Sequence, residues 1–124
     1  MNKRILILDD NQAILEVVTE ALAYEQFEVL DISLGSQLLE AVDQFMPDLI
    51  LLDYRLADRN GGDLCLQLKA TPAYRHIPVI IFSAYFSAND SRPDGCDGIL
   101  YKPFDLESLL NTVNEHLFGS MSNS

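Results

Sequence analysis

Cysteine and basic residues are both scarce in this sequence, and each shortage excludes a class of protein. The two cysteines, Cys65 and Cys96, have no CxxC spacing, which argues against a zinc site and against a disulfide scaffold. Cys65 lies between two leucines and is expected to be a small core residue. Eight lysines and arginines stand against 19 acids, for a formal net charge of −11. Such a charge repels nucleic-acid phosphates and anionic membranes, so we expect neither as a partner.

Long apolar runs are also missing. No apolar stretch approaches the length needed to span a membrane. The apolar run that follows the N-terminus has only four residues, which is too short for a signal peptide. We therefore expect a cytoplasmic protein. A length of 124 residues suits one domain. We expect that domain to cover residues 1–119, with a polar, disordered tail at 120–124.

Short apolar runs are what the sequence does contain, and segments of helical periodicity separate them. Continuous apolar runs of this length predict strands buried on both faces, as in a parallel sheet. They are residues 5–8, 49–52, 79–82 and 99–101, with a weaker run at 29–32 that fits an edge strand. The alternation predicts a doubly wound α/β fold with a five-stranded parallel sheet and helices on both faces. Asp105 is placed to cap the last helix. Turn-forming residues and Pro93 between Ser83 and residue 96 predict a short or irregular fourth helix.

Polar residues follow four of these runs where each strand should end. Asp9 and Asp10 follow the run at residues 5–8, and Asp53 follows the run at 49–52. Ser83 follows the run at 79–82, and Lys102 follows the run at 99–101. Ligand sites of open α/β sheets lie beyond the carboxyl ends of the strands, so these side chains should converge. Any one of them alone is more often a cap, turn or surface residue. The combination at matched strand ends indicates a site.

The chemistry of this set points to phosphoryl transfer. Three carboxylates at one sheet edge repel each other unless they are protonated or bridged by a cation, and oxygen ligands suit Mg²⁺. With the metal bound, an Asp53 oxygen can attack an incoming phosphoryl group. Lys102 then supplies positive charge and Ser83 donates a hydrogen bond.

Four segments carry a resemblance to a known family. Residues 5–11 (ILILDDN), 47–53 (PDLILLD), 77–84 (IPVIIFSA) and 102–104 (KPF) resemble the receiver domain of two-component response regulators, over about residues 3–118. The resemblance implies the strand order 2-1-3-4-5 and a phosphoryl acceptor at Asp53. It also implies Asp10, Asp53 and the Arg55 carbonyl as Mg²⁺ ligands, with Asp9 acting through water.

The same resemblance implies further roles around the phosphate. Lys102 would pair with it, Ser83 would close onto it, and Ala84 would leave backbone space for a phosphate oxygen. The Lys102-Pro103 peptide bond would be cis. The implied partners are a histidine kinase or phosphotransfer protein and a downstream protein target, with the chain as a monomer or weak dimer. No enzymatic activity is expected beyond the chain's own phosphorylation and dephosphorylation.

Several positions depart from the family pattern. Ile99 stands where members commonly carry an aromatic switch residue, and Tyr101 is expected to lie on the wrong alternation to replace it. Ala57 replaces a frequent proline, and the distance from Ser83 to Lys102 is short. Arg55 could reach the phosphate and change its lifetime. These departures affect the predicted readout rather than phosphorylation.

Three alternatives remain open. A receiver-shaped scaffold that works without phosphate would fit the Ile99 departure. An aspartate-nucleophile phosphohydrolase is disfavoured because the first strand lacks the DxD pair and no cap domain is present. A flavodoxin-like cofactor binder is disfavoured because Asp9 and Asp10 would repel FMN.

Overall fold

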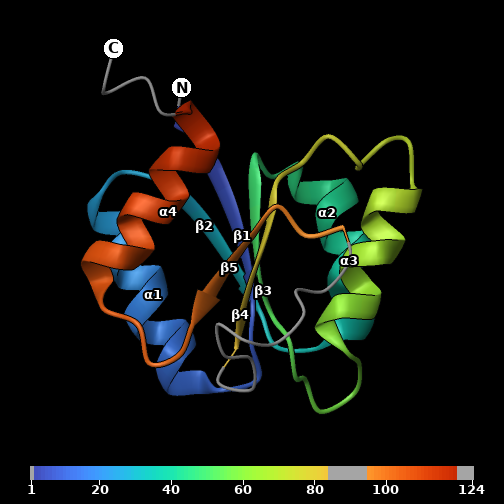
Figure 1. Cartoon of the computed structure of the whole chain (residues 1–124), viewed down its shortest axis with the longest axis horizontal. Helices are drawn as coiled ribbons and strands as arrows, with labels where there is room; N and C mark the ends of the chain where they lie inside the picture. The colour runs from blue at the N-terminus through green and yellow to red at the C-terminus, as the bar shows by residue number, and fades with distance from the viewer. Residues whose placement is uncertain (1, 84–94, 120–124) are drawn as a thin grey trace.

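The computed structural model describes residues 2–83 and 95–119, and in this part of the chain five parallel strands form one sheet. The strands run in the order β2-β1-β3-β4-β5 (Figure 1), which confirms the predicted order and fold class. They are β1 (Arg4–Leu8), β2 (Glu28–Ile32), β3 (Leu49–Asp53), β4 (Val79–Ser83) and β5 (Gly98–Tyr101). The predicted short fourth helix falls at residues 84–94 and the predicted tail at 120–124, both outside the described residues.

Helices cover both faces of the sheet, as expected. The helices are α1 (Gln12–Tyr24), α2 (Leu38–Phe45), preceded by a 3₁₀ turn η1 (Gly35–Gln37), α3 (Gly61–Ala70) and α4 (Leu106–Phe118). Helices α1 and α4 pack on one face, and α2 and α3 on the other (Figure 1). Among the described helices, none combines the length and the apolar character that a membrane span requires.

The apolar strands explain the core. Every residue of β3 and β4 is buried, as central parallel strands require when helices cover both faces. Alternate side chains divide the core in two: one cluster lies under α2 and α3 and includes Cys65, which is 0% exposed as predicted. The other cluster lies under α1 and α4 and includes Phe82.

Polar side chains cap the N-termini of three helices. Asn11 caps α1 and Asn60 caps α3, in each case by accepting hydrogen bonds from amides of the first turn. Asp105 accepts a 2.7 Å bond from the Ser108 amide at the start of α4, which confirms the predicted cap. These caps satisfy amides that have no partner inside their helix.

The expectation for Tyr101 was wrong. Residues two apart on a strand face the same side, so Tyr101 shares the side of Ile99 rather than the opposite one. The burial pattern agrees, because Gly98 and Leu100 are buried while Ile99 and Tyr101 are more exposed. Tyr101 is moreover the register partner of Ser83 on β4.

Candidate functional site

The carboxyl ends of the strands bring the predicted site residues to one edge of the sheet. Asp53 is the last residue of β3 and Ser83 the last of β4. Asp9 directly follows β1 and Lys102 directly follows β5. Since β1, β3, β4 and β5 are consecutive in the sheet, the four positions lie side by side. The edge strand β2 adds no side chain to this predicted set.

The three aspartates form one oxygen cluster. Asp9, Asp10 and Asp53 each offer a carboxylate oxygen, and the three atoms lie within 4.8 Å of one another. Asp9 is 0% and Asp53 5% exposed, whereas Asp10 is exposed. Two buried carboxylates and one at the surface form a donor set of hard oxygens with an open side for water or substrate. This is the donor set that Mg²⁺ prefers, so the residues present fit the metal that the sequence suggests.

Backbone amides hold the acidic pair in place. The Asn11 amide donates to Asp9 Oδ1 at 2.9 Å, which orients that carboxylate just before α1. The Ala57 amide donates to Asp10 Oδ2 at 2.9 Å, which ties the first loop to the loop after β3. The role of Ala57 was not foreseen, and the only signal was that Ala57, unlike the frequent proline at this position, has an amide N–H to donate.

Lys102 is the positive charge of the cluster. Its ammonium lies 3.1 Å from Asp9 Oδ2 and 3.3 Å from Asp53 Oδ1. The same nitrogen lies 4.9 Å from the centre of the Phe82 ring, within the range of a cation–π contact. The Lys102-Pro103 peptide bond that follows is cis, as the resemblance implied.

Burial raises the pKa of the Asp53 carboxyl group. Burial and the neighbouring Asp9 carboxylate raise the pKa of Asp53 to about 6, while Lys102 opposes the rise. Removing water disfavours the ionised form, and a second negative charge adds to that effect. A perturbed carboxyl group beside charged partners is typical of functional sites.

The loop after β3 returns sharply to Asp53. The Gly61 amide donates to the Tyr54 carbonyl at 2.6 Å. A Cβ at Gly61 would lie 2.8 Å from the Tyr54 Cα and 2.9 Å from the Asp53 carbonyl carbon, so only glycine fits there without a shift. Arg55 is exposed and pairs with Asn60 in an isolated bridge across this loop.

Ser83, the Arg55 carbonyl and Ala84 are the remaining predicted positions. Ser83 is fully buried, and its carbonyl accepts a 2.9 Å bond from the Lys102 amide. The Arg55 carbonyl as a ligand remains a prediction. Ala84 lies outside the described residues.

Phe82 contacts a predicted site residue, Lys102, and this contact was not predicted from the sequence. Phe82 ends the apolar run at residues 79–82, for which the sequence predicted only a buried strand. A signal was nevertheless present, since Phe82 precedes Ser83 on the strand that should lie between Asp53 and Lys102.

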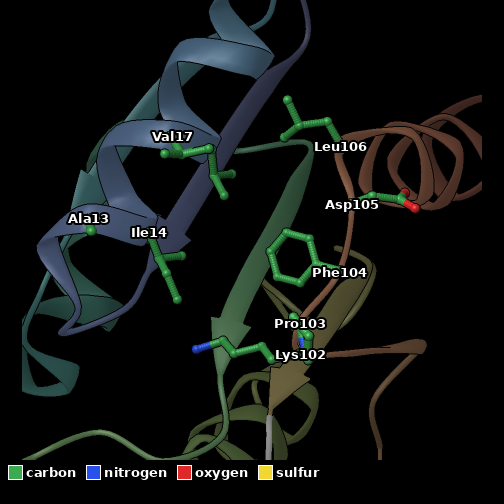
Figure 2. A pocket seen from close by; sticks show the side chains of 9 residues that line it. Ala13, Ile14, Val17, Lys102, Pro103, Phe104, Asp105 and Leu106 are labelled. Atoms are coloured by element: carbon green, nitrogen blue, oxygen red, sulfur yellow. The ribbon is translucent and has the colours of Figure 1, made fainter.

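An apolar pocket of about 620 Å³ opens beside Lys102. Ile14 and Val17 of α1 line one side, and Phe104, just before α4, and Leu106, the first residue of α4, line the other (Figure 2). Val17 is 54% and Leu106 44% exposed. The pocket therefore places an accessible apolar surface next to the charged cluster.

Comparisons with known proteins agree on one family. The family model described as the response regulator receiver domain matches residues 5–114. The DNA-binding response regulator MtrA of Mycolicibacterium smegmatis is 35% identical over 120 residues, which cover 94% of this chain and 51% of MtrA. The polar-differentiation response regulator DivK of Brucella ovis is 28% identical, with 94% of this chain and 98% of DivK covered.

Solved structures give the same result. The crystal structure of a CheY-like response regulator receiver domain protein from Methanospirillum hungatei JF-1 has a TM-score of 0.88 and 27% identity, with both chains covered completely. The chain spans about half the length of the MtrA proteins it matches and nearly all of DivK.

Proposed function

The chain belongs to the response regulator receiver domain family of two-component signalling, and we propose that Asp53 is its phosphoryl acceptor. The observation that carries the proposal is the convergence of a buried Asp53 with two further aspartates and a lysine at one sheet edge. Asp53 belongs to the oxygen cluster, contacts Lys102 at 3.3 Å, and is the last residue of the central strand β3.

Asp53 acts as the nucleophile in this proposal. One carboxylate oxygen attacks the phosphorus of a phosphohistidine or of acetyl phosphate. The bond from phosphorus to the histidine nitrogen or to the acetyl oxygen breaks, and its electrons leave with the imidazole or the acetate. The product is an acyl phosphate on Asp53, which water later hydrolyses to inorganic phosphate and the free carboxylate. The chain thus catalyses only its own phosphorylation and dephosphorylation.

Lys102 and Ser83 stabilise the transferred group. Lys102 lies 3.3 Å from the attacking carboxylate, so its ammonium can exchange a carboxylate partner for a phosphate oxygen. Ser83 ends the neighbouring strand and would donate its hydroxyl proton to a second oxygen. Ala84 would leave room for the phosphate beside the backbone. Hydrogen-bond donors and cations fixed around the negative charge of the phosphoryl group lower the activation barrier of its transfer.

Asp9, Asp10 and Asp53 would hold Mg²⁺, with the Arg55 carbonyl as a further ligand. Bound there, the metal would neutralise charge on the phosphoryl oxygens. As the family resemblance implies, Asp9 would take part through a water, and its carboxylate pairs with Lys102 at 3.1 Å.

A protein donor and a protein target complete the proposal. A histidine kinase or phosphotransfer protein would bring its phosphohistidine to Asp53. The apolar pocket beside Lys102 supports this proposal, because it offers such a donor protein a contact surface next to the acceptor. A downstream protein would then recognise the phosphorylated form. The acidic charge of −11 favours partners with basic surfaces. A monomer or weak dimer and a cytoplasmic location remain predictions.

The test is phosphorylation by acetyl phosphate, followed by intact mass. Wild type should gain one phosphoryl group only when Mg²⁺ is present, and Asp53→Asn should gain none. Asp31→Asn, at an exposed position on the edge strand, is the matched control and should behave as wild type. A folded, Mg²⁺-binding wild type that never gains the adduct would instead favour a scaffold that signals without phosphate.

A further inference from the structure

We propose that Phe82 is a positioning residue for Lys102, and that the face of its ring holds the ammonium where it meets Asp53. This inference rests on the proposed role of Asp53 as acceptor. It adds an aromatic side chain, otherwise part of the apolar core, to the set that organises phosphoryl transfer.

The sheet explains why residue 82 has this opportunity. Strand β4 lies between β3 and β5, and Asp53 is the register partner of Phe82, which in turn pairs with Leu100. Side chains at paired positions of neighbouring strands stand on the same face of the sheet. Lys102 is two residues beyond Leu100 and so shares that face. To reach Asp53, the Lys102 side chain must pass over β4, and Phe82 is the last β4 residue on that side.

The contact itself has the geometry of a cation–π interaction. The Lys102 nitrogen lies 4.9 Å from the centre of the Phe82 ring, inside the limit of about 6 Å. The ring is 1% exposed and the lysine side chain 16%. Little water therefore competes with the negative face of the ring for the ammonium.

A second ring fixes the plane of the first. Phe104 meets Phe82 with ring centres 5.9 Å apart and an angle of 81° between the planes, which is the favourable edge-to-face arrangement. Phe104 is also a wall of the apolar pocket, and Figure 2 shows its ring facing Ile14 and Val17 across that space. The contacts therefore continue from the pocket wall through Phe104 and Phe82 to Lys102.

The ring gives the ammonium a third partner besides its two carboxylates. Lys102 contacts both Asp9 and Asp53, and these two contacts alone would let it move toward either one. The ring face below restricts that movement and keeps the charge beside the acceptor. An aliphatic side chain would fill the volume without attracting the cation.

Fluorination of the ring separates attraction from packing. Incorporation of 4-fluoro-, 3,5-difluoro- and 3,4,5-trifluorophenylalanine at position 82 weakens the negative ring face stepwise with little change in volume. We expect the Mg²⁺-dependent rate of phosphorylation by acetyl phosphate to fall stepwise, by about three- to tenfold in total. In the wild-type NMR spectrum, the Lys102 Hε protons should lie upfield of the other lysines because of the ring current.

Phe45 provides a matched control. The Arg4 guanidinium lies 5.7 Å from the centre of its ring, at a place remote from the carboxylate cluster. The same fluorinated series at Phe45 should leave the rate unchanged. Equal rates across the position 82 series, or Lys102 Hε protons at an ordinary shift, would overturn the inference. An absence of phosphorylation in wild type would instead count against the acceptor assignment, while the NMR shift would still report on the ring contact.

Discussion

The Lys102 ammonium lies 3.3 Å from the Asp53 carboxylate, on the same oxygen cluster that would bind Mg²⁺. The lysine and the metal therefore both draw on the negative charge of these carboxylates. In the proposed mechanism Lys102 would have two opposed effects: it would weaken Mg²⁺ binding by repulsion and stabilise the transferred phosphate by attraction.

Substituting Lys102→Met should separate these two effects. We expect Mg²⁺ to bind about three- to tenfold more tightly, because a positive charge close to the metal is gone. Phosphorylation by acetyl phosphate should slow at least about tenfold, because the phosphate loses its cation. Calorimetric titration with Mg²⁺ and intact mass against time measure the two quantities. The exposed Lys3→Met is the control, and weaker Mg²⁺ binding by Lys102→Met would contradict the argument.

The raised pKa of Asp53 predicts how stability depends on pH in the metal-free protein. Burial and Asp9 raise this pKa from 3.8 to about 6, so folding favours the protonated carboxyl group. Its stabilising contribution is complete below pH 3.8 and is lost as the pH rises through 6. Between pH 7.5 and 5, the free energy of unfolding of wild type relative to Asp53→Asn should rise by about 1 kcal/mol.

Urea unfolding with chelator present, at several pH values, measures this difference. Comparison with Asp53→Asn cancels the titration of the other acids. Saturating Mg²⁺ should remove the trend, because the metal favours the ionised carboxylate. A wild-type curve that runs parallel to that of Asp53→Asn would show that Asp53 titrates normally.

Much of this fold could be predicted because its central strands are buried on both faces. The apolar runs ending at Leu8, Leu52 and Phe82 mark strands, and the polar residue after each run marks the site. The strand order came from the family resemblance rather than from any single residue. What the sequence could not show is which atoms meet, such as the Ala57 amide on Asp10, since a main-chain donor is present at nearly every position.

One prediction was wrong, and another was correct but incomplete. Tyr101 was expected on the opposite side from Ile99, but side chains two residues apart on a strand point to the same face, as the burial pattern of β5 shows. Phe82 was predicted only as part of a buried strand, and its 1% exposure confirms that prediction. Its contact with Lys102 depends on the cation crossing β4, which requires the strand order to be known.

The two cysteines should differ strongly in reactivity. Burial raises the pKa of the Cys65 thiol to about 11, and the residue is 0% exposed. At pH 8 only about one Cys65 in a thousand is a thiolate, the form that reacts with alkylating agents. Native protein treated with iodoacetamide should therefore gain one label quickly, at the half-buried Cys96.

Intact mass against time, with and without denaturant, checks this expectation. Cys96→Ser should resist labelling when folded and gain one label when unfolded. Cys65→Ser should label as quickly as wild type in its first step. Rapid labelling of native Cys96→Ser would mean that the α3 region opens far more often than its packing suggests.

Gly61→Ala should disturb the acceptor through the backbone. The added Cβ would meet the Tyr54 Cα and the Asp53 carbonyl carbon at 2.8 and 2.9 Å, so the chain after Asp53 has to shift. We expect a loss of stability of about 1–3 kcal/mol, as for other overpacked sites. Phosphorylation should also slow, because Asp53 moves relative to the Lys102 ammonium.

Val42→Ala, in the buried face of α2 far from the site, should lose comparable stability. It should nevertheless keep the wild-type rate once folded, and equal slowing in both variants would mean that the rate follows stability rather than the geometry at Asp53.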